Sequence, residues 1–186
     1  KCELCDPVEV KELFRNYPNI DSVIHFAARK QVGESVEKPL WYYQQNINGM
    51  LNVLEGMKEA GVKKLVFSSS AATYGVPPVD VVPEDVEPMV PINPYGQTKL
   101  FGEWMARACE QPYGIRFCGL RYFNVAGCGP VQLEDPAILN LIQCSSTVSS
   151  RARHRRSSAT TTRLRTAPAC ATTFTSPISP TRTSPH

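Results

Sequence analysis

Short apolar runs alternate with helical stretches through residues 1–143, and this alternation restricts the possible folds more than any other feature of the chain. Each apolar run is too short for a helix, which is typical of a buried parallel strand. Residues 42–60 place apolar side chains at three- and four-residue steps, as an amphipathic helix does, and Asn93-Pro94 opens a second helix over 95–110. Strands are expected at 22–27, 64–68 and 119–123, and a short helix at 8–17. This order predicts an α/β fold with a partial, doubly wound parallel sheet.

The chain changes character after residue 143. Residues 144–186 contain seven arginines but no lysine and no acidic residue, whereas residues 1–143 hold all 17 acidic side chains. The second stretch is rich in Ser, Thr, Ala and Pro and has no apolar periodicity, so it lacks the surface for a packed core. We therefore expect one folded domain over 1–143 and a disordered basic tail over 144–186.

Composition excludes several classes of protein. No run reaches about 18 apolar residues, so no membrane-spanning helix is expected, and no apolar signal peptide is visible. The seven cysteines are odd in number and scattered, which favours a reducing compartment, and we expect a cytoplasmic protein. Cys2 and Cys5 have the spacing of metal ligands, but no second Cys/His pair follows, so we expect no metal site. Because the chain begins with Lys1 rather than Met, we expect a fragment.

Small and polar residues follow each expected strand. The carboxyl ends of parallel strands meet at one edge of a doubly wound sheet, where ligands bind. The segments that collect there are 26–30, 68–70 and 123–127. This edge is therefore the expected place of a functional site.

Tyr95 and Lys99 are the strongest candidates for chemistry. They are four residues apart on an expected helix, so their side chains lie on one face, one turn apart. A nearby ammonium stabilises a phenolate, and we expect Lys99 to lower the pKa of Tyr95 towards neutrality and make it a general base. Ser70 offers a hydroxyl that can share a proton with a substrate hydroxyl, and Lys99 can hold ribose hydroxyls of a nucleotide. The alternative is an exposed Tyr/Lys pair without chemical function, which is common on helices.

Five blocks of sequence resemble the UDP-glucose 4-epimerase branch of the extended short-chain dehydrogenases/reductases, whose catalytic set is Tyr-x-x-x-Lys with an upstream Ser. The blocks occur in the family's order and are His25–Ser35, Pro39–Tyr43, Ser68–Gly75, Asn93–Lys99 and Leu120–Asn124. The resemblance covers roughly residues 3–136 and implies a Rossmann-like fold. It also implies NAD as cofactor, a UDP-hexose as substrate, and an isomerase of galactose metabolism. A full-length member of the family could form a homodimer.

The resemblance also implies residue roles. Tyr95 would take the proton from the hydroxyl on carbon four of the hexose while hydride passes to NAD, and the 4-keto sugar would turn over before hydride returns to its other face. Lys99 would bind the nicotinamide ribose and tune Tyr95, and Ser70 would hydrogen-bond the sugar oxygen. Gln45 stands where the family has an Asn that contacts the cofactor. The implied contacts with NAD are those of Phe26, Ala27, Ala28, Arg29, Lys30, Gln45, Tyr95, Lys99 and Phe123, and those with substrate are of Ser70, Tyr95 and Asn124.

Other functions stay open beside the epimerase. Nucleotide-sugar 4,6-dehydratases share the Tyr/Lys pair but carry Asp-Glu where this chain has Ala71 and Ala72, which have no proton to move; this favours the epimerase. The sequence also lacks the family's Gly-x-x-Gly-x-x-Gly turn, which lets the backbone approach the dinucleotide diphosphate. We therefore expect little or no activity of the chain as written. The alternatives are an enzyme for another nucleotide sugar, including N-acetylglucosamine forms, and a non-catalytic remnant.

The tail has three interpretations. A basic arm for nucleic acid or phosphate and a phosphorylatable linker both lack a motif, and we expect no nucleic-acid partner. In the third, GC-rich codons for residues 157–182, shifted by one nucleotide, read as sequence that resembles the sugar domain of the same family. We hypothesise that the tail is a frameshifted translation of that domain, joined near residue 143. An intact genomic reading frame that encodes the tail as written would refute this.

Overall fold

The computed structural model describes residues 1–79 and 81–125. Contacts divide the chain into two units between Tyr122 and Phe123, and the first unit holds all the described helices and strands. The expected domain boundary at 143, the tail over 144–186 and its frameshift origin lie outside the described residues and stay predictions.

Three parallel strands form the sheet, in the order β1-β2-β3. Strand β1 spans Ser22–His25, β2 spans Lys64–Ser70 and β3 spans Arg116–Tyr122. The three expected strands are present with different bounds: β1 ends at His25 rather than at residue 27, β2 continues to Ser70, and β3 begins at Arg116 and ends one residue before 123. The register brings the strand ends to one edge, where Ser70 lies beside Tyr122.

The main helices begin and end at residues suited to those positions. Helix α1 (Pro7–Asn16) is capped by the carboxylate of Asp6, which accepts hydrogen bonds from two backbone N–H groups. Helix α4 (Gly49–Ala60) ends at Gly61, whose φ of 73° suits a residue without a side chain. Helix α5 (Pro94–Ala108) has Pro94 in its first turn and the Asn93 side chain as its cap.

Shorter elements complete the described chain. Helix α2 spans Val32–Glu37, and α3 (Pro39–Tyr43) runs through the π-helical turn η1 (Gln44–Asn48) into α4. A 3-10 turn η2 (Ala71–Thr73) follows β2, and α6 (Glu110–Tyr113) follows α5. The expected helix over 42–60 is thus part of a longer helical stretch, while α2, α6 and η2 had no clear periodicity in the sequence.

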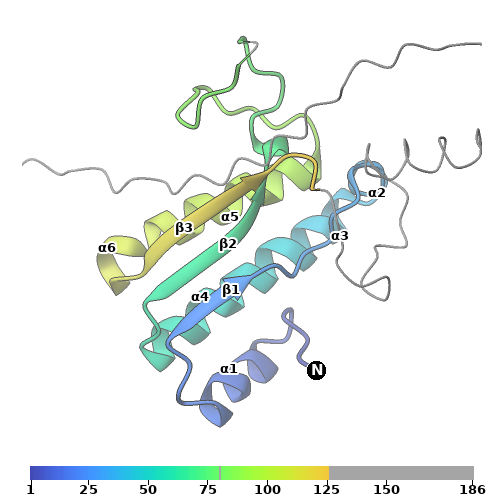
Figure 1. Ribbon diagram of the computed structural model, residues 1–186. Coiled ribbons are helices and arrows are strands. Elements are labelled where there is room, and N and C mark those ends of the chain that lie inside the picture. Colours follow the sequence, from blue (N-terminus) through green and yellow to red (C-terminus); the bar gives the residue numbers. More distant parts are fainter. Residues whose placement is uncertain (80, 126–186) are drawn as a thin grey trace, which may run out of the picture. The chain divides into compact units, whose positions relative to one another are not determined.

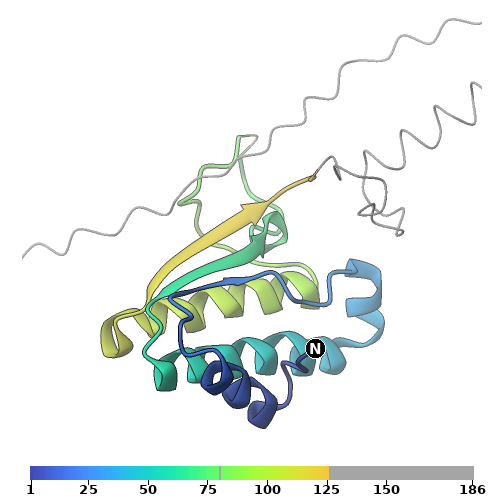
Figure 2. The ribbon, with the colours of Figure 1, turned by 60° about the horizontal axis from the view of Figure 1, so that its bottom comes forward.

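One helical layer covers one face of the sheet. Figures 1 and 2 show α4 and α5 side by side behind the strands, with α1 beside α4. Apolar side chains between these helices and the sheet form the core; its buried members are Val10, Phe14, Met50, Val53, Leu54, Met57, Val62, Leu65, Phe67, Ala106 and Ile115. The α/β prediction is confirmed. The described helices cover one of the two faces that helices cover in a doubly wound sheet.

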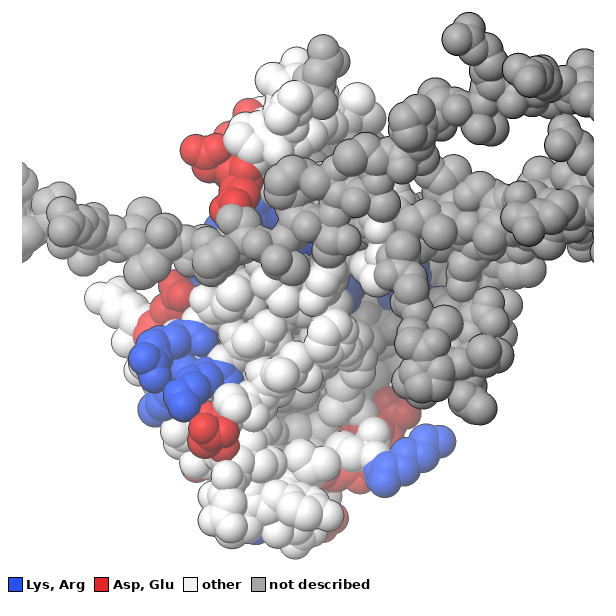
Figure 3. All heavy atoms as spheres, viewed as in Figure 1, with Lys and Arg blue, Asp and Glu red and all other residues white. Residues whose placement is uncertain are grey.

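The opposite face of the sheet has no covering helix among residues 1–79 and 81–125. Figure 3 looks onto this side, where the exposed side chains are largely uncharged and the charged ones gather nearer the rim. Phe26, which follows β1, stacks on Tyr122 at the end of β3, with ring centroids 6.3 Å apart. Within the described part of the chain, no helix is long and apolar enough to cross a bilayer.

Candidate active site

Ser70 and Tyr95 meet at the carboxyl edge of the sheet. Ser70 is the last residue of β2, and its hydroxyl accepts a hydrogen bond from the backbone N–H of Ala72 at 3.2 Å. Tyr95 lies in the first turn of α5, close enough to Ser70 that the Ser70 side chain favours the ionised form of the phenol. The structure therefore brings together two hydroxyls that are 25 positions apart in the sequence, as the site prediction requires.

A glycine allows the start of α5 to approach the end of β2. A methyl group added at Gly96 would lie 2.6 Å from the backbone carbonyl oxygen of Ala72, closer than a real contact allows. Asn93 fixes the helix start, because its side-chain oxygen accepts from the N–H of Gly96 at 2.8 Å. The position of Tyr95 is thus fixed by two residues near it in the chain: Asn93 caps the helix start, and Gly96 packs closely against the Ala72 carbonyl.

Lys99 lies one turn along α5, buried with 4% of its surface exposed. Its Nζ donates to the carbonyl oxygen of Ser68 at 2.7 Å, and lies 5.0 Å from the centroid of the Phe67 ring and 5.9 Å from that of Tyr95. Burial lowers the pKa of Lys99 to about 8. The ammonium therefore keeps its charge at neutral pH but is easier to deprotonate than an ordinary lysine.

The electrostatic effect on Tyr95 differs from the sequence prediction. Burial raises the pKa of Tyr95, and the Ser70 side chain and the nearby charge of Lys30 offset this only in part. The prediction that Lys99 lowers this pKa towards neutrality is therefore wrong for this structure. The physical reason is that the Lys99 ammonium turns to the Ser68 carbonyl, whereas Lys30 supplies the charge that acts on the phenol.

His25, at the end of β1, is a buried neutral base beside the site. Its ring stacks on Phe67, with centroids 5.8 Å apart and planes 12° from parallel. Burial, together with the charge of Lys99, lowers the pKa of His25 to about 4. One aromatic ring thus contacts both the imidazole and the ammonium, and only the ammonium is charged at neutral pH.

An asparagine that the sequence analysis did not single out holds the segment after β1. Asn46 lies in the π-helical turn, where its side-chain oxygen accepts from the N–H of Arg29 at 2.8 Å. Its amide nitrogen donates to the carbonyl oxygen of Arg29 at 3.1 Å and to the hydroxyl of Thr98 at 3.0 Å. π-Helical turns often occur at functional sites, so this turn points to a role for Asn46. The spacing of apolar residues in the sequence does not reveal such a turn. Asn46 connects the expected cofactor segment to α5.

The structure gives the positions of the other residues predicted to contact the cofactor. Phe26, Ala27, Ala28, Arg29 and Lys30 follow β1 directly and run along the carboxyl edge of the sheet. Their roles stay predictions, as does the contact of Gln45, which lies next to the buried Asn46.

Phe123 and Asn124 follow β3 in the chain and begin the second unit. Their roles towards cofactor and substrate stay predictions. Among residues 1–79 and 81–125, no group of three or more His, Cys, Asp or Glu side chains could hold a metal ion, and Cys2 and Cys5 are free thiols.

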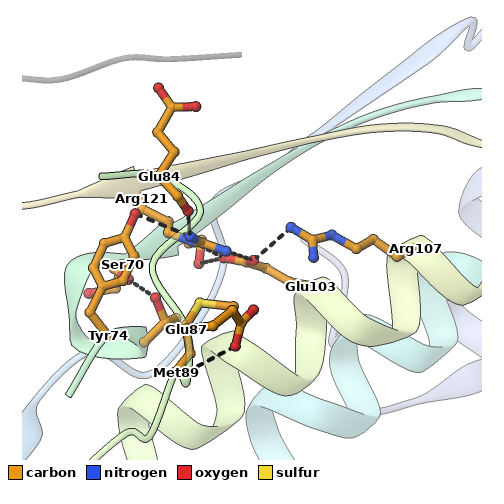
Figure 4. A network of polar contacts seen from close by, with 10 residues as sticks. Ser70, Tyr74, Glu84, Glu87, Met89, Glu103, Arg107 and Arg121 are labelled. Carbon is orange, nitrogen blue, oxygen red and sulfur yellow. Dashed lines mark hydrogen bonds and ion pairs between the residues drawn. The ribbon is translucent and has the colours of Figure 1, made fainter. Parts of the chain in front are cut away.

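A buried polar network, also not anticipated, lies on the helix side of Ser70. Glu103 on α5 accepts hydrogen bonds from Ser69 and from Arg121 on β3 (Figure 4). Its sequence signal was weak: a carboxylate four residues after Lys99 reads as an ordinary i,i+4 partner on an exposed helix face.

We expect acid to destabilise the chain through His25. In the unfolded chain its pKa is 6.5, and in the folded chain it is about 4, so the unfolded state binds more protons between these values. The free energy of unfolding therefore falls as pH decreases from 6.5 to 4, by on the order of 3 kcal/mol from this residue. Urea denaturation at pH 7 and pH 4 measures it, with His25→Gln for comparison. If the free energy of unfolding falls equally in the original chain and in His25→Gln, the loss does not come from His25.

Gly96→Ala should lower the free energy of unfolding by about 1–3 kcal/mol, because the new methyl group would push the Ala72 carbonyl away from α5. Gly33→Ala is the matched control, since a methyl group there meets nothing within 4 Å. On helix α2 that change should leave stability unchanged or raise it by up to about 1 kcal/mol. Chemical denaturation measures the free energy of unfolding of both variants. An equal change in the two variants would argue against the close approach of α5 to the Ala72 carbonyl.

Comparison with known proteins agrees with this geometry. The model of the NAD dependent epimerase/dehydratase family matches residues 1–147. A UDP-glucose 4-epimerase of Streptococcus mutans is 50% identical over 129 residues, which cover 69% of this chain and 38% of that protein.

Solved structures show the same relation. A UDP-glucose 4-epimerase from Brucella ovis in complex with NAD has a TM-score of 0.65 and 42% identity, covering 68% of this chain and 38% of that one. One from Stenotrophomonas maltophila, with bound NAD and formylated UDP-arabinopyranose, has a TM-score of 0.72 and 35% identity, covering 81% and 46%. The chain thus spans less than half the length of these relatives. The resemblance seen in the sequence is confirmed: the chain belongs to the NAD dependent epimerase/dehydratase family.

Proposed function

We propose that this chain carries the proton-transfer residues of an NAD-dependent UDP-glucose 4-epimerase, an isomerase that interconverts UDP-glucose and UDP-galactose. The observation that carries the proposal is the placement of Ser70 at the end of β2 beside Tyr95 at the start of α5, with the buried Lys99 one turn along the same helix. The identity of about 50% to curated UDP-glucose 4-epimerases supports this substrate class. The aligned part of this chain covers 38% of such a relative, and the proposal therefore concerns the proton-transfer residues.

The residues at the edge of the sheet fit the nicotinamide ribose of the cofactor. An ammonium has three donors, and the bond of Lys99 to the Ser68 carbonyl uses one, so others can serve ribose hydroxyls. The segment Phe26–Lys30, Gln45 and Phe123 would line the same cofactor. The sequence has no Gly-rich turn for the diphosphate, so these residues account for one end of the dinucleotide only. When bound, NAD supplies the hydride acceptor and donor for carbon four of the hexose.

In the proposed reaction, Tyr95 moves one proton. Its phenolate oxygen takes the proton of the hydroxyl on carbon four, directly or through Ser70, as that carbon loses hydride. Tyr95 returns the proton to the sugar oxygen once hydride returns to the other face of the 4-keto sugar. Burial raises the pKa of Tyr95, and the charge of Lys30 opposes this by favouring the ionised form. Asn124 would contact the sugar.

A dehydratase is the second candidate, and the turn after Ser70 argues against it. Ala71–Thr73 form η2 and include no carboxyl group that could remove water from a sugar.

Among solved relatives, a UDP-Glc/GlcNAc 4-epimerase of Campylobacter jejuni is 37% identical with a TM-score of 0.68. Product analysis should therefore use both UDP-galactose and its N-acetylated form.

A chimera tests the proposal, because the diphosphate-binding turn is not in this sequence. The 129 aligned residues of this chain would replace their counterparts in the Streptococcus mutans epimerase. The chimera should convert UDP-galactose to UDP-glucose, and Tyr95→Phe should lower its kcat by about 10²–10⁴-fold through loss of the proton acceptor. Coupled assay of UDP-glucose measures both.

Tyr113→Phe in the same chimera is the control, since Tyr113 lies on α6 away from Ser70 and should leave kcat unchanged. The unmodified 186-residue chain with added NAD should show little or no turnover. An active Tyr95→Phe chimera would refute the role of Tyr95, and robust turnover by the chain alone would show that the Gly-rich turn is not required.

The proposal includes a homodimer and a cytoplasmic enzyme without a nucleic-acid partner. Phe101 and Trp104 on α5 expose 44% and 53% of their surfaces, and Leu51 on α4 exposes 44%. Exposed apolar groups of this size on two adjacent helices suit a self-complementary interface. The free thiols of the described cysteines suit a reducing compartment.

Sedimentation equilibrium tests the homodimer. The chain should sediment as a dimer, and Trp104→Glu should shift it to a monomer, because a charge would be buried in the interface. Leu40→Glu is the matched control: Leu40 is more exposed but lies on α3. A monomer before any substitution, or equal dissociation in both variants, would refute the interface.

A further inference from the structure

The Lys99 ammonium is buried without an opposite charge beside it. Its Nζ donates to the Ser68 carbonyl oxygen at 2.7 Å, and no ion pair among residues 1–79 and 81–125 includes it. Removal from water disfavours the charged form of a lysine, and burial accordingly lowers the pKa of Lys99 to about 8. Neutral neighbours must therefore supply whatever stabilisation of this charge water does not.

Phe67, the residue before Ser68 on β2, presents its ring to this ammonium. Nζ of Lys99 lies over the ring, 5.0 Å from its centroid. The face of an aromatic ring carries partial negative charge and attracts a cation within about 6 Å, most strongly where water is excluded. Phe67 exposes 3% of its surface and Lys99 4%, so water is largely excluded from this contact. Two adjacent residues of β2 thus hold the ammonium, one through a carbonyl oxygen and one through a ring.

Two other elements fix the position of the Phe67 ring. His25 on β1 stacks on it, with centroids 5.8 Å apart and planes 12° from parallel. On the side of α5, a methyl group added at Gly102 would lie 2.7 Å from the ring atom Cζ, so the helix closes on the ring because this position has no side chain. The ring therefore cannot turn away from Lys99 without disturbing contacts with both neighbours.

His25 does not compete with Lys99 for the ring at neutral pH. Burial, together with the charge of Lys99, lowers the pKa of His25 to about 4, so the imidazole is uncharged. A charged imidazole would be attracted to the same ring and would repel the ammonium. The titratable groups that face Lys99 are His25 from β1 and Tyr95 from its own helix, and both are uncharged at pH 7.

We propose that Phe67 is a positioning residue for Lys99, whose ring stabilises the buried ammonium and holds it beside Tyr95. The inference rests on the proposed function for the use of this ammonium towards the nicotinamide ribose, whereas the contact itself belongs to this chain alone. A role in core packing requires only an apolar group of the right volume at position 67. The proposed role also requires the negative charge of the ring face, so the two roles separate when that charge changes and the shape does not.

Fluorination of the ring provides this change, because fluorine withdraws electron density from the ring face and adds little volume. The 186-residue chain would carry 4-fluoro-, 3,5-difluoro- or 3,4,5-trifluorophenylalanine in place of Phe67, together with lysine labelled with carbon-13 at Cε. NMR titration gives the pKa of each lysine, and the signal missing from Lys99→Met identifies Lys99. The pKa of Lys99 should fall stepwise with the number of fluorines, by about 0.4–1.5 in the trifluoro protein, where most of the attraction is lost.

The same three replacements at Phe14 are the matched control. Phe14 is another buried member of the core, on α1, and its ring lies against Gly56 of α4. Fluorination there should leave the pKa of Lys99 unchanged. Thermal unfolding should show similar small changes in Tm at both positions, because the core keeps its shape in each protein.

A constant Lys99 pKa across the folded Phe67 series would overturn the proposal. An equal fall in the Phe14 series would overturn it too, because the effect would then come from the core as a whole. If the trifluoro protein does not fold, the monofluoro and difluoro proteins decide by the same criterion. A stepwise fall confined to Phe67 supports the proposal even if the chimera is inactive, since that second result would refute the epimerase and leave the contact standing.

Discussion

The close approach of α5 to the end of β2 is the constraint on which the site depends. It exists because Gly96 has no side chain to meet the Ala72 carbonyl, and because Asn93 fixes the helix start. From that start, a spacing of four residues determines where Lys99 and Glu103 meet the strand. A displaced first turn would therefore move every polar contact between helix and strand together.

The buried charged groups at this edge differ in whether an opposite charge faces them. The Arg121 guanidinium meets the Glu103 carboxylate, whereas the Lys99 ammonium has only a carbonyl oxygen and aromatic rings. This difference explains why burial lowers the pKa of Lys99 to about 8 but leaves Arg121 firmly charged. His25, whose ring stacks on Phe67, stays neutral chiefly because it is buried, and the charge of Lys99 adds to this.

The sequence was sufficient for the strands, the two main helices and the convergence of Ser70, Tyr95 and Lys99, because these follow from periodicity and from the geometry of parallel sheets. It was insufficient where tertiary contacts decide. Helix α2 is short and half exposed, so its apolar spacing carries little signal. Asn46 reads as a polar residue on a helix until a π turn buries it, and Glu103 becomes a buried anion only when β3 brings Arg121 beside it. The pKa of Tyr95 is raised because the phenol is buried, and the charge of Lys30 offsets this only in part; spacing along the chain gives neither the burial nor the position of Lys30.

The same contacts fix the end of β2 against α5 by means that do not involve a phosphate-binding turn. The bonds among Ser68–Ser70, α5 and Arg121 are all made between residues 68 and 121, within a core that the described chain itself supplies. Affinity for a dinucleotide, by contrast, depends on backbone N–H groups close to its phosphates, which this sequence does not offer in a Gly-rich turn. Placement of polar side chains at the end of β2 and binding of a dinucleotide's phosphates are therefore separate physical problems in this fold, and the described residues supply the contacts for the first.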